Sequence, residues 1–162
     1  MFRKMRRHKQ ALSQEACRAI LDRGSSGVLA LSGDDGYPYA LPISYLYDGE
    51  KLYFHCAKTG HKIDAIRRCG KASFCVIDQD KVVPERYTTH YRSVIAFGRI
   101  QIMEPGPEFM AAIEKLAAKY APNQSMEQHR AEINGSLGSL CLLAMEIDHM
   151  TGKQCREMAE QG

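Results

Sequence analysis

The chain has 162 residues and a net charge of +3, with 44% hydrophobic and 25% charged residues, which suits one soluble domain over residues 1–162. That charge is too small to indicate nucleic-acid binding, and no apolar run reaches the roughly 18 residues of a membrane span. The basic start "MFRKMRRHKQ" is not followed by the apolar stretch of a signal peptide. We therefore expect a cytoplasmic protein with a basic arm at 1–12, no nucleic-acid or membrane partner, and six free cysteine thiols.

The first half predicts one helix followed by a meander of strands. In "LSQEACRAILDRG" Ser13 is a good N-cap and Gly24 a good helix end. Residues 27–57 then alternate strand-forming runs with the turns "DDG" and "DG". Pro38 and Pro42 lack backbone N–H donors, so the second strand must lie at a sheet edge or be bulged there.

The second half predicts further strands with short helices between them. A helix lies between Gly60 and Gly70, a strand covers 71–78, and the polar stretch 79–87 is predicted to be a loop. A long strand over 88–104 should be bent or bulged at Gly98.

After that strand, Pro107 suits the first turn of a helix that ends near Tyr120. Residues 122–137 are either a short helix or an irregular lid, and the last strand, 139–148, leads into a C-terminal tail at 150–162. The fold class is mainly β, a small antiparallel barrel with about six strands.

The stretch "HCAKTGHKIDAIRR", residues 55–68, carries most of the candidate chemistry. Zinc is disfavoured because His55 and Cys56 are neighbours on a strand and point to opposite faces, so they cannot easily join His61 on one ion. We expect no metal site. An anion site suits the stretch better, because Gly60, His61 and Lys62 stand at a helix N-terminus, where unpaired N–H groups favour phosphate. A solvated surface helix is the alternative, and local physics leaves both open.

Three segments together resemble one family. "YPYALPISYLYDGEKLYFHCAKTGHKIDAIRR" (37–68), "YRSVIAFGRI" (91–100) and "TGKQ" (151–154) are similar to the pyridoxamine 5'-phosphate oxidase-like FMN-binding split barrels, in particular their nitroimidazole-resistance (Nim-like) branch. This resemblance implies a homodimer of six-stranded split barrels with FMN at the subunit interface. Cys56 replaces a frequent serine, and the arginine-rich ending of true pyridoxamine phosphate oxidases is absent, which argues against a vitamin B6 substrate.

The resemblance also implies positions for the cofactor. His61 and Lys62 would hold the FMN phosphate, with His55 and the backbone of Cys56 and Ala57 beside it. A second copy of the chain would contribute Ser93. The strand along the flavin ring would supply Tyr39, Ala40, Leu41, Pro42 and Ser44.

The implied function is an FMN-dependent oxidoreductase. It would pass electrons from a reduced nicotinamide, or another donor, to a small planar acceptor such as a nitroaromatic compound. No catalytic residue is assigned, because the flavin would carry the chemistry. The alternative is a sensor, store or electron carrier without turnover, binding flavin, a deazaflavin or haem; His55, His90 and His149 are the candidate haem ligands.

Overall fold

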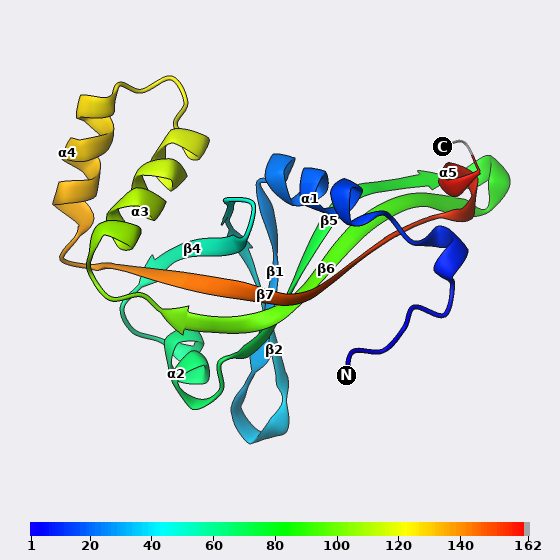
Figure 1. Cartoon of the computed structure of the whole chain (residues 1–162), viewed down its shortest axis with the longest axis horizontal. Coiled ribbons are helices and arrows are strands. Elements are labelled where there is room, and N and C mark those ends of the chain that lie inside the picture. The colour runs from blue at the N-terminus through cyan, green and yellow to red at the C-terminus, as the bar shows by residue number, and fades with distance from the viewer. Residues whose placement is uncertain (161–162) are drawn as a thin grey trace.

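The computed structural model describes residues 1–160, and in that part of the chain seven strands form one antiparallel sheet with helices at its margins (Figure 1). The strands are β1 (Ser26–Ser32), β2 (Pro38–Ser44), β3 (Leu46–Tyr47), β4 (Lys51–Ala57), β5 (Lys71–Val83), β6 (Thr88–Ile102) and β7 (Leu140–Gln154). The helices are α1 (Gln14–Arg23), α2 (His61–Arg68), α3 (Pro107–Tyr120), α4 (Met126–Ser136) and α5 (Arg156–Ala159). Single 3-10 turns cover His8–Gln10, Asp34–Gly36 and Pro84–Arg86. The predicted mainly-β class is confirmed.

The two edge strands of the sheet are consecutive in the chain. The order across the sheet is β2-β1-β5-β6-β7-β4-β3, and only Tyr45 separates β2 from β3. The sheet therefore curves until its two edges meet at this residue. The prediction of six strands is wrong by one, because the second predicted strand is interrupted at Tyr45 and its two halves pair with different neighbours.

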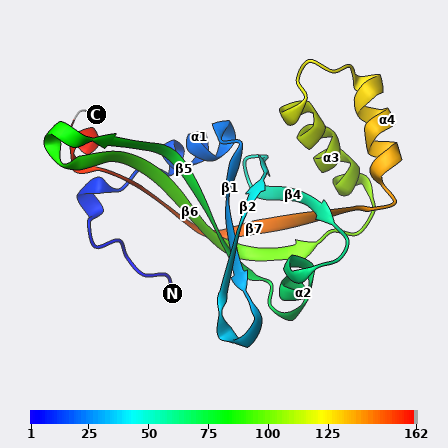
Figure 2. The ribbon, with the colours of Figure 1, turned by 180° about the vertical axis from the view of Figure 1, so that it is seen from behind.

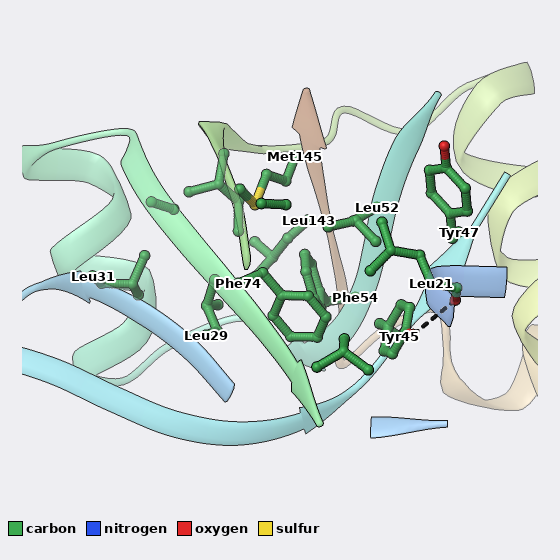
Figure 3. Packing of buried hydrophobic residues seen from close by; sticks show 14 of the residues in the cluster. Leu21, Leu29, Leu31, Tyr45, Tyr47, Leu52, Phe54, Phe74, Leu143 and Met145 are labelled. Carbon is green, nitrogen blue, oxygen red and sulfur yellow. Dashed lines mark hydrogen bonds between the residues drawn. The ribbon is translucent and has the colours of Figure 1, made fainter. Parts of the chain in front are cut away.

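Hydrogen bonds to two helices hold this interruption in place. Tyr45 is fully buried, and its hydroxyl donates a 2.7 Å hydrogen bond to the carbonyl of Leu21 in α1 (Figure 3). Its backbone N–H donates to the hydroxyl of Tyr120, the last residue of α3, at 2.8 Å. The break in the ladder thus costs little, because the freed backbone groups find partners. Burial raises the pKa of Tyr45 well above its usual value.

The core lies inside the curved sheet, closed by α1 and α2. Phe74 of β5 is at its centre, with edge-to-face contacts to Tyr45 and Phe54 at ring-centroid distances of 4.9 and 5.1 Å. Figure 3 shows leucines from four elements around these rings. A second, smaller cluster lies between α3, α4 and the other face of β4 and β7; it includes Tyr53, Phe109, Leu116 and Leu142. The α3–α4 hairpin is thereby fixed over β4.

The β5–β6 hairpin is longer than the sequence indicates. Residues 79–87 were predicted to be a loop, but β5 continues to Val83 and only the 3-10 turn at Pro84–Arg86 separates it from β6. The hairpin projects beyond the rest of the sheet (Figure 2). That prediction is wrong because a projecting ribbon is solvated on both faces and lacks the hydrophobic alternation of a half-buried strand.

Several local predictions are confirmed. Ser13 caps α1 by accepting a hydrogen bond from the Ala16 N–H, and Gly24 is the C-cap. The edge strand β2 contains both prolines. The β6–β7 register shifts between Phe97 and Gly98, which is the expected bulge.

Two uncertain stretches turn out to be regular. Residues 126–136 form the helix α4, which begins with a capping box between Ser125 and Gln128. The predicted end of the last strand at residue 148 is too early, because β7 runs to Gln154 and α5 follows. The final residues of the predicted C-terminal tail, 161–162, lie outside the described residues. None of the helices between residues 1 and 160 combines the length and apolar character of a membrane span.

Candidate functional site

The β4–α2 connection has the geometry of an anion-binding loop. β4 ends at Ala57 and α2 begins at His61, after Gly60 as N-cap. Gly60 has φ +118°, a conformation that favours glycine, and a Cβ there would meet nothing within 4 Å. Its carbonyl accepts from the N–H groups of Ile63 and Asp64. The start of α2 therefore presents backbone N–H groups to open space.

His61 is held in a defined orientation. Its ring stacks on Tyr39 of β2, with centroids 4.0 Å apart and an interplanar angle of 16°. Its Nε2 lies 3.4 Å from a carboxylate oxygen of Asp34, in the β1–β2 turn. Asp34 also accepts a hydrogen bond from Arg68 at the end of α2, and this bond, more than any other contact, holds the pKa of Asp34 below its usual value. Tyr39 and His61, both expected at the site, are thus brought together.

Lys62 lies close enough to Cys56 to act on its thiol. The pKa of Cys56 is raised to about 11, chiefly by burial; the Lys62 ammonium lowers it and the adjacent Cys141 raises it. Cys56 and Cys141 are directly opposite each other on β4 and β7. The Cys56 sulfur is therefore a neutral thiol at physiological pH, and its electrostatic contribution to an anion there is small.

His55 points away from Cys56, as expected for neighbours on a strand. Its side chain is exposed and lines a cavity of about 200 Å³ between β4, α3 and α4, with Tyr120 and Glu132 among the other lining residues. Lys58, in the loop, donates a 2.6 Å hydrogen bond to the carbonyl of Gly138. The loop is thus tied to the turn between α4 and β7.

The strand β2 offers one apolar face to the interior and one to the outside. Tyr39, Leu41 and Ile43 pack against the core, whereas Ala40 and Pro42 are exposed. The predicted residue Ser44 ends the strand, opposite Ser26 of β1. The outward residues Ala40 and Pro42 carry no charge, which suits an aromatic ring.

Ser93 is separate from these residues within one chain. It lies on β6 with Ile77 and Lys153 as its neighbours in the sheet, five residues before the bulge at Gly98. At about 3.3 Å per residue this places it about 16 Å along the strand from the bulge. In the sheet β7 lies between β6 and β4, so Ser93 is not on a strand that borders the β4–α2 loop, and its expected role there belongs to a second copy of the chain.

The residues present fit a flavin mononucleotide in part. The Gly60–Lys62 segment supplies backbone and cationic donors for a phosphate, and the uncharged outer face of β2 suits the ring system. In residues 1–160 no group of three or more His, Cys, Asp or Glu side chains is placed to hold a metal ion. Sequence reasoning missed Asp34, which contacts His61, and Arg68, which holds Asp34; the turn signal "SGDDG" located Asp34 but not its partners.

Comparison with known proteins identifies the family. Residues 13–154 match the model of the pyridoxamine 5'-phosphate oxidase family. An uncharacterized protein, RA0666, of Rhizobium meliloti (strain 1021) is 26% identical over 152 residues, covering 89% of this chain and 93% of its own.

Two solved structures share the fold. One is a candidate 5-nitroimidazole antibiotic resistance protein from Bacteroides thetaiotaomicron, with TM-score 0.73 and 20% identity over 89% of this chain and 86% of its own. The other is an FAD and haem binding protein from Mycobacterium smegmatis, with TM-score 0.71 and 22% identity over 91% and 74% of the two chains.

The family match covers most of the chain, including β2, the β4–α2 loop and the start of β6. The expected family is confirmed, and the structural likeness to the nitroimidazole-resistance protein agrees with the branch at the level of the fold. The chain belongs to the pyridoxamine 5'-phosphate oxidase family.

Proposed function

We propose that the protein is an FMN-dependent oxidoreductase that passes electrons from a reduced nicotinamide, or another donor, to a small planar acceptor. The observation that supports this most directly is the Gly60–Lys62 segment, with its oriented His61, in a chain of this family. A nitroaromatic compound is the acceptor suggested by the relative described as a nitroimidazole-resistance protein.

Each predicted residue has a role that its position allows. Lys62 and His61 donate to the phosphate, and the stacking on Tyr39 and the Asp34 carboxylate keep the His61 ring in place. The backbone of Cys56 and Ala57 borders the phosphate, with His55 on the far side of the strand.

The bound flavin would supply hydride and electron transfer. The chain's own part is to bind, orient and shield it. Tyr39, Leu41 and the core behind them hold β2 rigid, so that its outer face of Ala40 and Pro42 keeps a fixed distance to the ring. The backbone of β2 through Ser44 completes that wall. A small acceptor would stack on the opposite side of the ring.

An exposed apolar row supports a homodimer. Pro42, Val28, Cys75 and Ile95 are direct neighbours across β2, β1, β5 and β6 and share the outer face of the sheet. Val28 and Ile95 are 37% and 36% exposed. Two residues before Ile95, on the same face, lies Ser93. A second copy that covers this row would bring its own Ser93 towards β2, which is the arrangement that the family resemblance implies.

The decisive experiment compares FMN with riboflavin, which lacks the phosphate. The wild-type chain with FMN bound should show a flavin absorption band at about 450 nm. It should bind FMN at least tenfold more tightly than riboflavin, because hydrogen bonds to a charged phosphate contribute about 1.5–3 kcal/mol. Lys62→Ala should lose most of this preference. Lys115→Ala, an exposed lysine of α3, is the matched control and should keep it.

Two results would reject the proposal. One is equal affinity for FMN and riboflavin in the wild-type chain; the other is an absence of flavin binding altogether. Tighter binding of FAD than FMN would correct the cofactor, in line with the FAD and haem binding relative. An intense absorption band near 400 nm after reconstitution with haem would favour the alternative of a haem-binding carrier.

Turnover separates an enzyme from a carrier. The loaded protein should consume NADH or NADPH steadily in the presence of a 5-nitroimidazole. Flavin binding without such consumption would favour the sensor or carrier.

The dimer has its own test. Ile77 is 63% exposed beside the apolar row, so Ile77→Asp should fold yet shift the mass in solution from dimer to monomer and weaken FMN binding. Met126→Asp, at a 54% exposed position on α4, should change neither. A wild-type chain that is monomeric with FMN bound would contradict the shared site.

A further inference from the structure

The basic N-terminal segment is fixed on the body of the protein. Leu12 N–H donates to the carbonyl of Gly152, and Ala11 forms a bridge with Lys153 of β7. The segment can approach this closely because residue 152 is glycine; a Cβ there would lie 2.4 Å from the sulfur of Cys17 and 2.8 Å from Leu12. The 3-10 turn at His8–Gln10 therefore lies beside α5, and the chain before it turns back towards the middle of the molecule (Figure 1).

Two adjoining hollows lie where these elements meet. One, of about 800 Å³, lies between the N-terminal segment, the hairpin tip and the start of α5. The other, of about 680 Å³, lies between the N-terminal segment and α5. Arg7, Gln10 and Arg156 line both. Each hollow has the size of a small-molecule site. They lie at the other end of the molecule from α2 (Figures 1 and 2).

The second hollow is strongly cationic. Arg6, Arg7, Lys9 and Arg156 line it, and the acidic residue among its lining residues is Glu160, which accepts a 2.7 Å hydrogen bond from Arg156. Arginine is suited to phosphate because its planar guanidinium offers paired donors. Between residues 1 and 14 the sequence has no acidic residue to neutralise this charge.

The first hollow offers aromatic and apolar surface instead. Tyr87 and Tyr91 line it with Val82, Val83 and Pro84. Tyr87 is fully exposed and adopts the left-handed conformation, with φ +48°, which is unfavourable for a bulky side chain. The Lys153 ammonium lies 5.4 Å from the centroid of the Tyr91 ring. An aromatic ligand would cover the solvent-exposed ring of Tyr87.

An unpartnered polar atom occurs at the same place. Gln10 Oε1 is buried and has no hydrogen-bond partner among the described residues. Gln10 lines both hollows. Buried polar atoms usually have partners, so a ligand donor that reached Gln10 would satisfy this oxygen.

We propose that the two hollows form one nucleotide-binding site, with phosphates held by Arg6, Arg7 and Arg156 and the base placed against Tyr87 and Tyr91. The cationic hollow matches the phosphates, the aromatic hollow matches the base, and Gln10 stands between them. The site uses none of the residues assigned to the flavin, so it stands whether or not the flavin proposal holds.

The test is calorimetric titration of the full chain with ATP, adenosine and pyrophosphate, with FMN present at the protein concentration so that the proposed flavin site is filled without excess FMN competing at the second site. ATP should bind at least about tenfold more tightly than adenosine, which lacks phosphate, and than pyrophosphate, which lacks a base. The doubly substituted Arg7→Ala/Arg156→Ala chain should weaken ATP binding by about tenfold or more. Arg130→Ala, an exposed arginine of α4, is the matched control and should have no effect.

Tyr87→Ala tests the aromatic half separately. Tyr87 is fully exposed, so its replacement should leave folding intact, weaken ATP binding several-fold, and leave pyrophosphate binding unchanged. Equal binding of ATP and pyrophosphate would overturn the proposal, and so would an ATP affinity that the double substitution leaves unchanged. Binding of single-stranded DNA through the same arginines, with no binding of ATP up to about 1 mM, would overturn it in favour of a polymer site.

Discussion

Replacement of Gly98 by alanine should be among the most destabilising single-methyl changes in this protein. Gly98 lies at the bulge where the β6–β7 register shifts. A Cβ at this position would lie 1.8 Å from the carbonyl oxygen of Glu146 and 3.2 Å from the Cα of Ile147. Both contacts are with backbone, so no side-chain rotation can relieve them.

The loss of stability follows from how far β7 must move to relieve the clash with the new Cβ. Ordinary contact would require β7 to move away by about 1.5 Å, in the middle of a strand that is paired on both sides. Overpacking of this kind costs about 1–3 kcal/mol, and each weakened ladder hydrogen bond adds about 1 kcal/mol. We expect a loss of about 3 kcal/mol in the free energy of unfolding, which corresponds to a fall of about 6–12 °C in melting temperature for a chain of this size.

Urea unfolding followed by circular dichroism measures this directly, with Gly135→Ala as the control. Gly135 lies within α4, and a Cβ there would meet nothing within 4 Å. The same substitution should therefore stabilise the protein at that position, by about 0.5–1 kcal/mol. If the urea midpoint of Gly98→Ala equals that of the wild-type protein, the close approach of β6 and β7 at the bulge is refuted.

Three further predictions concern the bend and the candidate site. Tyr45→Phe should lower the free energy of unfolding by about 1–2 kcal/mol in urea titrations, because the buried carbonyl of Leu21 loses its partner; an unchanged midpoint would show that this bond is dispensable. The folded-state pKa of Asp34 is depressed, chiefly by its hydrogen bond from the last arginine of α2. Its contribution to stability is therefore present above pH about 4 and lost as the pH falls through the lower folded-state value, so Asp34→Asn should show a smaller drop in melting temperature between pH 6 and pH 3. Hydrogen bonds, chiefly one from a backbone N–H, lower the pKa of Cys69, whereas the pKa of Cys56 is raised to about 11, chiefly by burial. Iodoacetamide at neutral pH should therefore modify Cys69 before Cys56. Peptide mass spectrometry that finds the reverse order would contradict these environments.

Local sequence signals predicted the elements whose causes are local. The helix α2 was predictable from Gly60, Gly70 and the spacing of Ile63 and Ile66, and the bulge from a glycine inside a strand pattern. The prolines of β2 indicated either an edge or a bulge, and the structure has β2 at the edge. In each case one residue type imposes a backbone conformation without help from the rest of the fold.

The features that could not be predicted from the sequence depend on contacts between residues far apart in the chain. Tyr120 satisfies the backbone of Tyr45, 75 residues earlier, and nothing near either residue indicates the other. The contact of His61 with Asp34 likewise joins a turn and a helix that are separated by three strands in the sequence. The resemblance to a family located the β4–α2 loop, but the orientation of His61 came only from the fold.

The single residue between β2 and β3 links the alignment of both sheet edges. A strand that slips by one position turns its interior side chains outward. Here a one-residue slip of β2 against β1 would remove Tyr45 from its buried position and change the register of β3 against β4. The correct register of each edge strand therefore requires the correct register of the other. An insertion of one residue at Tyr45 would be far less tolerated than an insertion in the turns on either side.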